Sequence, residues 1–144
     1  RGNSGEEAVK IAKLLRENGA DIIHVSAGQT SSEQKPIYGR MFQTHLSEQV
    51  RLEAGIPTIA VGNITTADQV NTILVAGRAD LVALARPHLS NPFFTLHAAA
   101  HYNWDVQHWP DQYLRGKDQA FKEASTENIR RAELLRAKKP ASHA

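Results

Sequence analysis

The fold of this chain is decided between residues 60 and 92, where the sequence reads AVGNITTADQVNTILVAGRADLVALARPHLSNP. Two apolar, strand-like segments within it end in a small residue followed by a polar one, at Gly62-Asn63 and at Ala85-Arg86. A helix-start signal follows each segment, so that two helix N-termini and an arginine could meet at one anion. The pattern predicts a phosphate site at the C-terminal rim of a parallel α/β barrel.

A helix-to-strand unit like this one also opens the chain. Ser4 and Glu7 form a capping-box pair, which predicts a helix that ends at Asn18-Gly19 and precedes a buried strand over residues 22–25. The residues expected on the buried face of that helix are Ala8, Ile11, Ala12 and Leu15. A polar loop from residue 27 to about residue 40 follows, and loops of this length often carry function.

The second and third units repeat the same order. A helix over residues 43–54 precedes a strand over 58–61, and a helix capped by Thr66 and ended by Gly77 precedes a strand over 81–84. The residues expected to face inward from the first of these helices are Leu46, Val50 and Leu52. Because each strand reaches the next through a helix, the strands must pair in parallel, and the fold class is α/β.

The pattern changes after the third strand. Asn91-Pro92 predicts the start of a helix that runs to about residue 100, and a polar helix is expected from about residue 118 to residue 138. We therefore expect residues 1–103 to form the C-terminal part of a barrel and residues 104–144 to form a helical extension. Three strands cannot close a barrel, so other strands are missing or the sheet pairs with something else.

Composition narrows the classes of function. The chain has 144 residues, 41% of them hydrophobic, which is enough for one ordinary core, and it has no cysteine for a disulfide or a thiolate site. Glutamates interrupt the basic residues near the C-terminus, so we expect no nucleic-acid partner. No apolar run reaches the roughly 20 residues of a membrane span, and we expect a cytoplasmic protein. His97 and His101 have a chelating spacing but no accompanying glutamate, so no metal is expected.

The residues from Gly77 to Pro92, together with Gly62-Asn63-Ile64, resemble the end of the Old Yellow Enzyme family of NAD(P)H:flavin oxidoreductases. The resemblance extends from about Glu6 to Gly116 and implies strands six, seven and eight of a TIM barrel. Three motifs look like the flavin-reductase half of bifunctional salicylyl-CoA and 2-aminobenzoyl-CoA hydroxylases, in which an FAD monooxygenase half precedes the barrel: Gly28-Gln29-Thr30, residues 36–44 (PIYGRMFQT) and residues 109–113 (WPDQY).

The resemblance implies FMN as the cofactor, NAD(P)H as the reductant, and a small activated alkene or aryl-CoA-derived molecule as the substrate. In the family the FMN phosphate lies at the ends of the last two strands, where Gly62 and Asn63 match one turn and Ala85 and Arg86 match the other. The family usually has glycine at the position of Ala85, and alanine allows a close approach only at φ angles that it can adopt. A salt bridge on the barrel rim is the alternative for Arg86.

Two further residues carry weaker implications. Gly28 ends the first strand at the same rim and could contact flavin or substrate through its backbone, although a plain tight turn explains it nearly as well. Arg115 resembles an arginine that in one branch of the family enters the active site of a neighbouring subunit, which implies a homo-oligomer. An exposed arginine in a loop is an equally good interpretation of Arg115.

The family's substrate-binding histidine pair and its proton-donating tyrosine belong to strands that this chain lacks. We therefore expect polypeptide upstream of Arg1, and we expect the isolated chain to be inactive. Two other functions stay open at this stage. One is a non-redox barrel enzyme that binds a phosphorylated substrate at the same rim, and the other is an inactive fragment that acts only in assembly.

Overall fold

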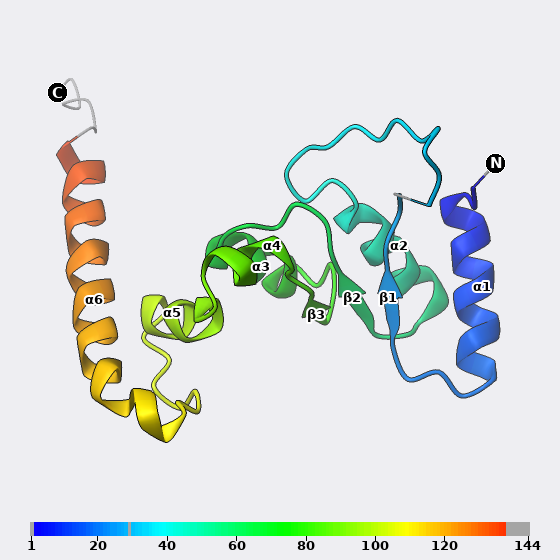
Figure 1. Cartoon of the computed structure of the whole chain (residues 1–144). Helices are drawn as coiled ribbons and strands as arrows, with labels where there is room; N and C mark the ends of the chain where they lie inside the picture. The colour runs from blue at the N-terminus through cyan, green and yellow to red at the C-terminus, as the bar shows by residue number, and fades with distance from the viewer. Residues whose placement is uncertain (1, 29, 138–144) are drawn as a thin grey trace, which may run out of the picture. The chain divides into compact units, whose positions relative to one another are not determined.

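Three short parallel strands form one sheet in the order β1-β2-β3 (Figure 1). The computed structural model describes residues 2–28 and 30–137, and the strands are β1 (Ile23–Val25), β2 (Thr58–Ala60) and β3 (Leu81–Val82). Strands that follow one another in the chain are neighbours in the sheet, which is the order of a segment of a parallel barrel. The predicted α/β class is confirmed, while the numbering of these strands as six, seven and eight stays a prediction.

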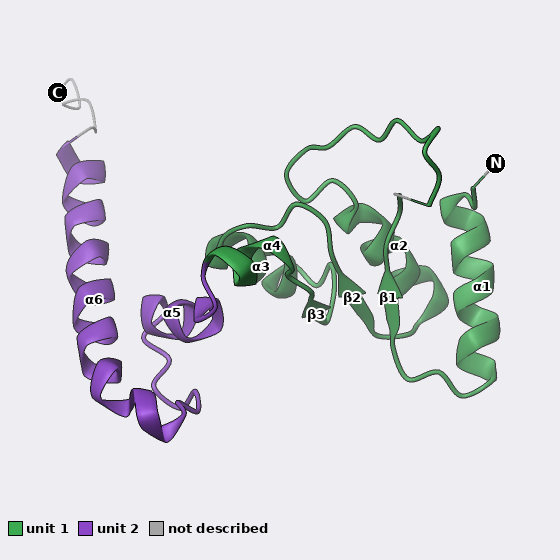
Figure 2. Ribbon diagram, in the orientation of Figure 1, with its two compact units in different colours: residues 1–90 green, residues 91–144 purple. Residues whose placement is uncertain are grey.

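The helices alternate with the strands and then continue beyond them. They are α1 (Gly5–Glu17), α2 (Thr44–Ala54), α3 (Ala67–Val75), α4 (Arg86–Ser90), α5 (Phe94–His101) and α6 (Leu114–Ala137), with a 3-10 turn η1 (Asp111–Tyr113) before α6. The chain packs as two compact units, residues 1–90 and residues 91–144 (Figure 2). The domain boundary expected near residue 103 stays a prediction.

Local signals in the sequence set the ends of the first three helices. The Ser4 hydroxyl accepts a hydrogen bond from the Glu7 N–H at 3.2 Å, and the Glu7 carboxylate accepts one from the Ser4 N–H at 2.6 Å, so the predicted capping box is confirmed. The hydrogen bond from the Ser4 backbone N–H to the carboxylate is the main cause that lowers the pKa of Glu7. Gly55, with φ +63°, ends α2, and the Thr66 hydroxyl caps α3 by accepting from the Gln69 N–H at 3.2 Å.

Two apolar clusters hold the first unit together. One joins α1, α2 and β1, and the other lies between β2, α3 and the start of β3; their fully buried members are Val9, Ala12, Val25, Val50, Ala54 and Ile56 in the first and Ala60, Ile64, Ile73 and Ala79 in the second. The expected inward positions of Ile11, Leu15 and Leu52 are wrong, since all three side chains are exposed. Helix α1 packs on the face that carries Val9 and Ala12, and Leu52 lies about 200° around α2 from Val50.

The end of the third unit also differs from the prediction. Strand β3 stops at Val82 instead of residue 84. The helix expected from Asn91 to about residue 100 is present as α5, which begins later, at Phe94, and the short helix α4 before it was not predicted. Helix α4 begins at Arg86 with Pro87 in its first turn, where a missing N–H costs nothing. Pro92 has no N–H to continue α4, and α5 starts at Phe94 without a side-chain cap, so Asn91 is not an N-cap.

Hydrogen bonds and an ion pair join the N-terminal ends of β2 and β3 to each other and to α2. The Asp80 carboxylate accepts hydrogen bonds from Arg51 Nε at 3.0 Å and from the Thr58 N–H at 2.9 Å, and these bonds lower the pKa of Asp80. The Ser47 hydroxyl donates to the buried Thr58 hydroxyl at 2.9 Å. Because α2, β2 and the start of β3 are linked here, this end of the sheet is built for stability.

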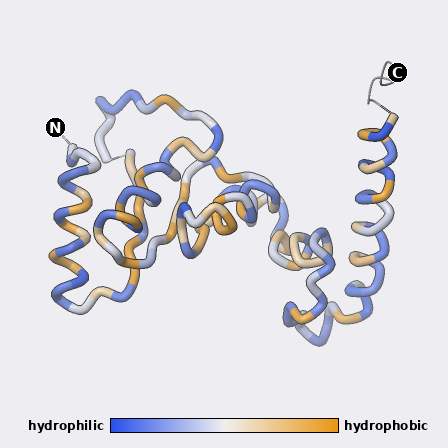
Figure 3. The backbone as a smooth tube through the Cα atoms, turned by 180° about the vertical axis from the view of Figure 1, so that it is seen from behind, coloured by the Kyte–Doolittle hydropathy of each residue, from blue (hydrophilic) through white to orange (hydrophobic). Residues whose placement is uncertain are grey.

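The second unit consists of α5, η1 and α6. The Asn128 side chain donates to the His101 carbonyl at 3.0 Å and ties α6 to α5, while Trp109 is buried in the same unit. Helix α6 starts at Leu114, earlier than predicted, and the predicted last residue, Lys138, lies outside the described residues. Polar and apolar residues alternate along α6 (Figure 3). No helix in the described part of the chain is long and apolar enough to cross a membrane.

Candidate functional site

A cavity of about 460 Å³ lies at the C-terminal ends of the three strands. Sixteen residues line it: Ser26, Ala27, Gly28, Tyr38, Phe42, Gln43, Val61, Gly62, Asn63, Ile64, Thr65, Ala83, Leu84, Ala85, Arg86 and Pro87. The structure therefore brings together all five residues that the sequence marked for cofactor binding, although these residues come from three separate turns. The volume of the cavity falls within the range of small-molecule sites.

The turn after β2 brings bare backbone to the cavity wall. Gly62 has φ +112°, and a Cβ added there would lie 2.6 Å from Cγ and Nε2 of Gln43. A larger residue is thus excluded both by conformation and by space. Within the hydrogen bonds of the described residues, none uses the backbone N–H of Gly62 or Asn63, so both N–H groups are available to a ligand.

Asn63 holds the long loop that follows β1. Its Nδ2 donates to the Gly39 carbonyl at 2.9 Å, and its own carbonyl accepts from the Met41 N–H at 3.1 Å. Asn63 and Met41 have φ angles of +50° and +53°, which asparagine tolerates better than most residues. Nδ2 of Asn63 therefore holds the loop, while no hydrogen bond among the described residues uses the backbone N–H of Asn63.

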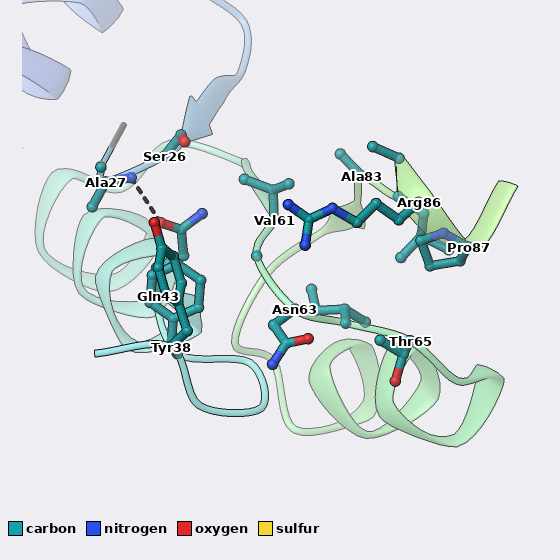
Figure 4. A pocket seen from close by; sticks show the side chains of 16 residues that line it. Ser26, Ala27, Tyr38, Gln43, Val61, Asn63, Thr65, Ala83, Arg86 and Pro87 are labelled. Carbon is teal, nitrogen blue, oxygen red and sulfur yellow. Dashed lines mark hydrogen bonds between the residues drawn. The ribbon is translucent and has the colours of Figure 1, made fainter. Parts of the chain in front are cut away.

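The turn after β3 supplies the positive charge. Figure 4 shows the Arg86 guanidinium directed into the cavity from the start of α4. Among the described residues that line the cavity, Arg86 is the one charged residue, and no ion pair joins it to any described carboxylate. The rim salt bridge considered as an alternative for Arg86 is absent from the described part of the chain. Ala85 is not among the residues with positive φ, so alanine fits where glycine is usual.

Residues 3–105 match the model of the NADH:flavin oxidoreductase / NADH oxidase family. The chain belongs to this family. It is similar to an NADPH dehydrogenase of Geobacillus thermodenitrificans, with 38% identity over 115 residues that cover 80% of this chain and 33% of that protein. An NADPH dehydrogenase of Clostridium acetobutylicum is 38% identical over 118 residues, covering 80% of this chain and 34% of its own length. The chain thus spans about one third of the length of these curated relatives.

The residues that line the cavity of this family member fit a phosphorylated flavin. The Gly62 turn presents backbone to the cavity wall, since the Gln43 side chain takes the space that a Cβ would need. No carboxylate is found among the described lining residues, and the Arg86 guanidinium can bind phosphate in a bidentate way. Tyr38 and Phe42 add an aromatic wall, with ring centroids 5.3 Å apart in an edge-to-face arrangement.

Gln43 lines the cavity, although sequence reasoning did not mark it as a site residue. Its side chain is only 5% exposed, and its Oε1 accepts a hydrogen bond from the Ala27 N–H at 2.9 Å. Gln43 therefore links the end of β1 to the turn at Gly62. The signal that could have found it was a glutamine placed directly before α2, at the end of the long loop.

The remaining predicted site residue lies elsewhere. Arg115 stands in the first turn of α6, in the second packing unit, where it is exposed and does not line the cavity. Arg115 is therefore helical and not in a loop. Its contact with a neighbouring subunit stays a prediction. Of the hydroxylase-like motifs, residues 36–44 form the loop and start of α2, whereas Gln29 lies outside the described residues.

Proposed function

We propose that this chain is the C-terminal third of an FMN-dependent NAD(P)H oxidoreductase, and that the cavity at its strand ends binds the phosphate of FMN. One observation carries the proposal: the Gly62 turn and the Arg86 guanidinium, from neighbouring strands, face one cavity without a carboxylate among the described lining residues. Family membership and relatives named NADPH dehydrogenase support the redox function over a non-redox phosphate-binding barrel.

Each residue has a distinct part in this proposal. The backbone N–H groups of Gly62 and Asn63 donate to phosphate oxygens, and Arg86 neutralises the phosphate charge. Gly28, at the end of β1, offers backbone to the flavin or the substrate. When bound, FMN supplies the hydride chemistry, accepting a hydride from NAD(P)H and passing it to a substrate, while the chain binds and orients it.

The isolated chain is proposed to bind flavin without turnover. The chain spans about one third of its curated relatives, and the donors that hold a substrate carbonyl in the family are not among its residues. The substrate class, an activated alkene or an aryl-CoA-derived molecule, rests on the resemblance alone. So do the hydroxylase subtype and an upstream FAD monooxygenase half.

Titration of the chain with FMN and with riboflavin, which lacks the phosphate, tests the proposed site. We expect FMN to bind at least about tenfold more tightly, because charged hydrogen bonds contribute about 1.5–3 kcal/mol. The R86A variant should bind FMN with less advantage over riboflavin, whereas R40A removes an arginine from the same rim outside the cavity and should keep the full difference. Equal affinity of the unsubstituted chain for the two flavins, or binding of neither, contradicts the proposal.

Arg115 is proposed to complete a partner's active site in an oligomer of the whole protein. Its exposed position on α6 leaves the guanidinium open to a second copy. In the whole protein, R115A should raise the KM for substrate while FMN content stays unchanged. An unchanged KM in a confirmed oligomer would remove Arg115 from the site.

A further inference from the structure

Gln43 is buried between two of the three turns that build the cavity. Its side chain is 5% exposed and lies directly before α2, yet it forms no capping bond with that helix. Instead it extends to the ends of two strands, because Oε1 receives the Ala27 N–H and the Cγ–Cδ stem covers the Cα of Gly62. The amide of such a side chain has an acceptor end and a donor end, and each can take its own partner.

The hydrogen bond from Ala27 fixes which end of the amide faces the cavity. A backbone N–H can only donate, so the atom that meets Ala27 at 2.9 Å must be the oxygen. Nε2 is therefore the atom beside Gly62, where it lies 2.6 Å from the position of a hypothetical Cβ. Figure 4 shows this nitrogen turned towards the cavity. No hydrogen bond among the described residues gives Nε2 an acceptor. Because Nε2 is also not one of the fully buried atoms that lack a partner, it is accessible from the cavity.

Three groups that line the cavity share one polarity. Nε2 of Gln43, the backbone N–H groups at Gly62 and Asn63, and the Arg86 guanidinium are all donors, and they come from the start of α2, the turn after β2 and the start of α4. Donors that gather on one side of a cavity favour an oxygen-rich anion. The neutral amide adds this preference without the cost of burying a second charge.

We propose that Gln43 is a ligand-binding residue of the cavity, held by Ala27 so that its Nε2 donates a hydrogen bond to an anionic oxygen of the bound ligand. This inference rests on the proposed function, which takes that oxygen from the FMN phosphate. It assigns Gln43 a direct contact, in addition to its packing against Gly62.

The variant Q43E tests the contact with little change of shape. One carboxylate oxygen can still accept from the Ala27 N–H, while the other replaces the donor by an acceptor that repels phosphate. We expect the affinity for FMN to fall about 10- to 100-fold at pH 8, as for loss of a hydrogen bond to a charged group, and the affinity for riboflavin to change much less. Q49E places the same charge on α2 outside the cavity and should bind FMN like the unsubstituted chain.

Flavin fluorescence gives the affinities, and far-UV circular dichroism checks the fold. If Q43E is unfolded, Q43M decides, because methionine keeps the length and carries no donor; it should lose about tenfold in FMN affinity. FMN affinity equal to that of the unsubstituted chain, in a folded Q43E or in Q43M, overturns the role of Gln43. If R86A lowers the preference for FMN over riboflavin at the same time, the proposed function stands without the contact from Gln43.

Discussion

The two ends of the same small sheet are built in opposite ways. At the N-terminal ends of β2 and β3, the Asp80 carboxylate is bonded to Arg51 and to the Thr58 N–H, and Thr58 is bonded to Ser47. At the C-terminal ends, the Gly62 turn carries no side chain and Arg86 has no ion-pair partner among the described residues. The first end satisfies its polar groups internally, whereas at the second end no described residue accepts from the Gly62 N–H or forms an ion pair with Arg86.

The residues that stabilise the sheet and the candidate binding residues thus lie at opposite ends of the same strands. Parallel strands place all their C-terminal ends at one rim, so that turns from distant parts of the sequence can share a cavity there. The opposite rim can then use ion pairs and hydrogen bonds to fix the strands without blocking the site. Substitutions at the two ends should therefore have different consequences, and measuring both binding and stability tests the division.

The largest effect is expected at the C-terminal end, for G62A. The new methyl group would meet Gln43 at 2.6 Å, and alanine is strained at φ +112°. We expect a loss of about 2 kcal/mol in the free energy of unfolding and at least a tenfold loss of FMN affinity, because Gln43 must move. Thermal melting and flavin titration measure the two effects.

The control for this prediction is G39A, a glycine on the loop of the same rim with nothing within 4 Å of a new Cβ and no positive φ. It should melt and bind like the unsubstituted chain. A G62A variant that also behaves like the unsubstituted chain would show that the turn does not need glycine, and the contrast between the two ends would be broken.

A smaller effect, confined to stability, is expected at the N-terminal end for D80A. The substitution removes the acceptor of the part-buried Thr58 N–H and the ion pair with Arg51. The Arg51 and Asp80 side chains are each about one third exposed, so solvent partly screens their ion pair. We expect the free energy of unfolding to fall by about 1–2 kcal/mol, with FMN affinity unchanged. Urea unfolding and flavin titration provide the two measurements.

Asp21 offers the matched control, since it is an exposed aspartate just before β1 at the same end of the sheet and makes no ion pair with a described residue. D21A should change the free energy of unfolding by less than about 0.5 kcal/mol. A loss of FMN affinity in folded D80A would mean that the two ends are coupled, and the division of labour would need revision.

The smallest effect is a pH dependence that also belongs to the N-terminal end. Hydrogen bonds from Arg51 and from the Thr58 N–H lower the pKa of Asp80 in the folded chain below its unfolded value of about 3.9. The stability from this carboxylate is therefore fully present above about pH 4 and is lost as the pH falls through the folded pKa. The difference in melting temperature between the unsubstituted chain and D80A should shrink below that pH. A constant difference down to pH 2 would contradict this assignment.

Much of the fold could be predicted because its signals are local. The capping pair at Ser4 and Glu7, the cap at Thr66 and the stop at Gly55 each act within one turn of chain, and the structure has them where the sequence placed them. The buried face of α1 was predicted wrongly at Ile11 and Leu15, since the sequence shows a helical period but not which face meets α2 and β1. The helix expected from Asn91 forms as α5 but starts at Phe94 without a side-chain cap, and the short helix α4 before it was not predicted.

The sequence by itself determined the unit order, the parallel pairing and the two strand-end signatures at Gly62-Asn63 and Ala85-Arg86, since these depend on short spacings along the chain. The tertiary structure has these signatures at one cavity with Gly28, as the sequence led us to expect, and it alone decided that Gln43 forms part of the wall. The physical reason is that the sheet brings together turns that the sequence separates, and a side chain such as Gln43 acquires its orientation only when Ala27 and Gly62 lie on either side of it.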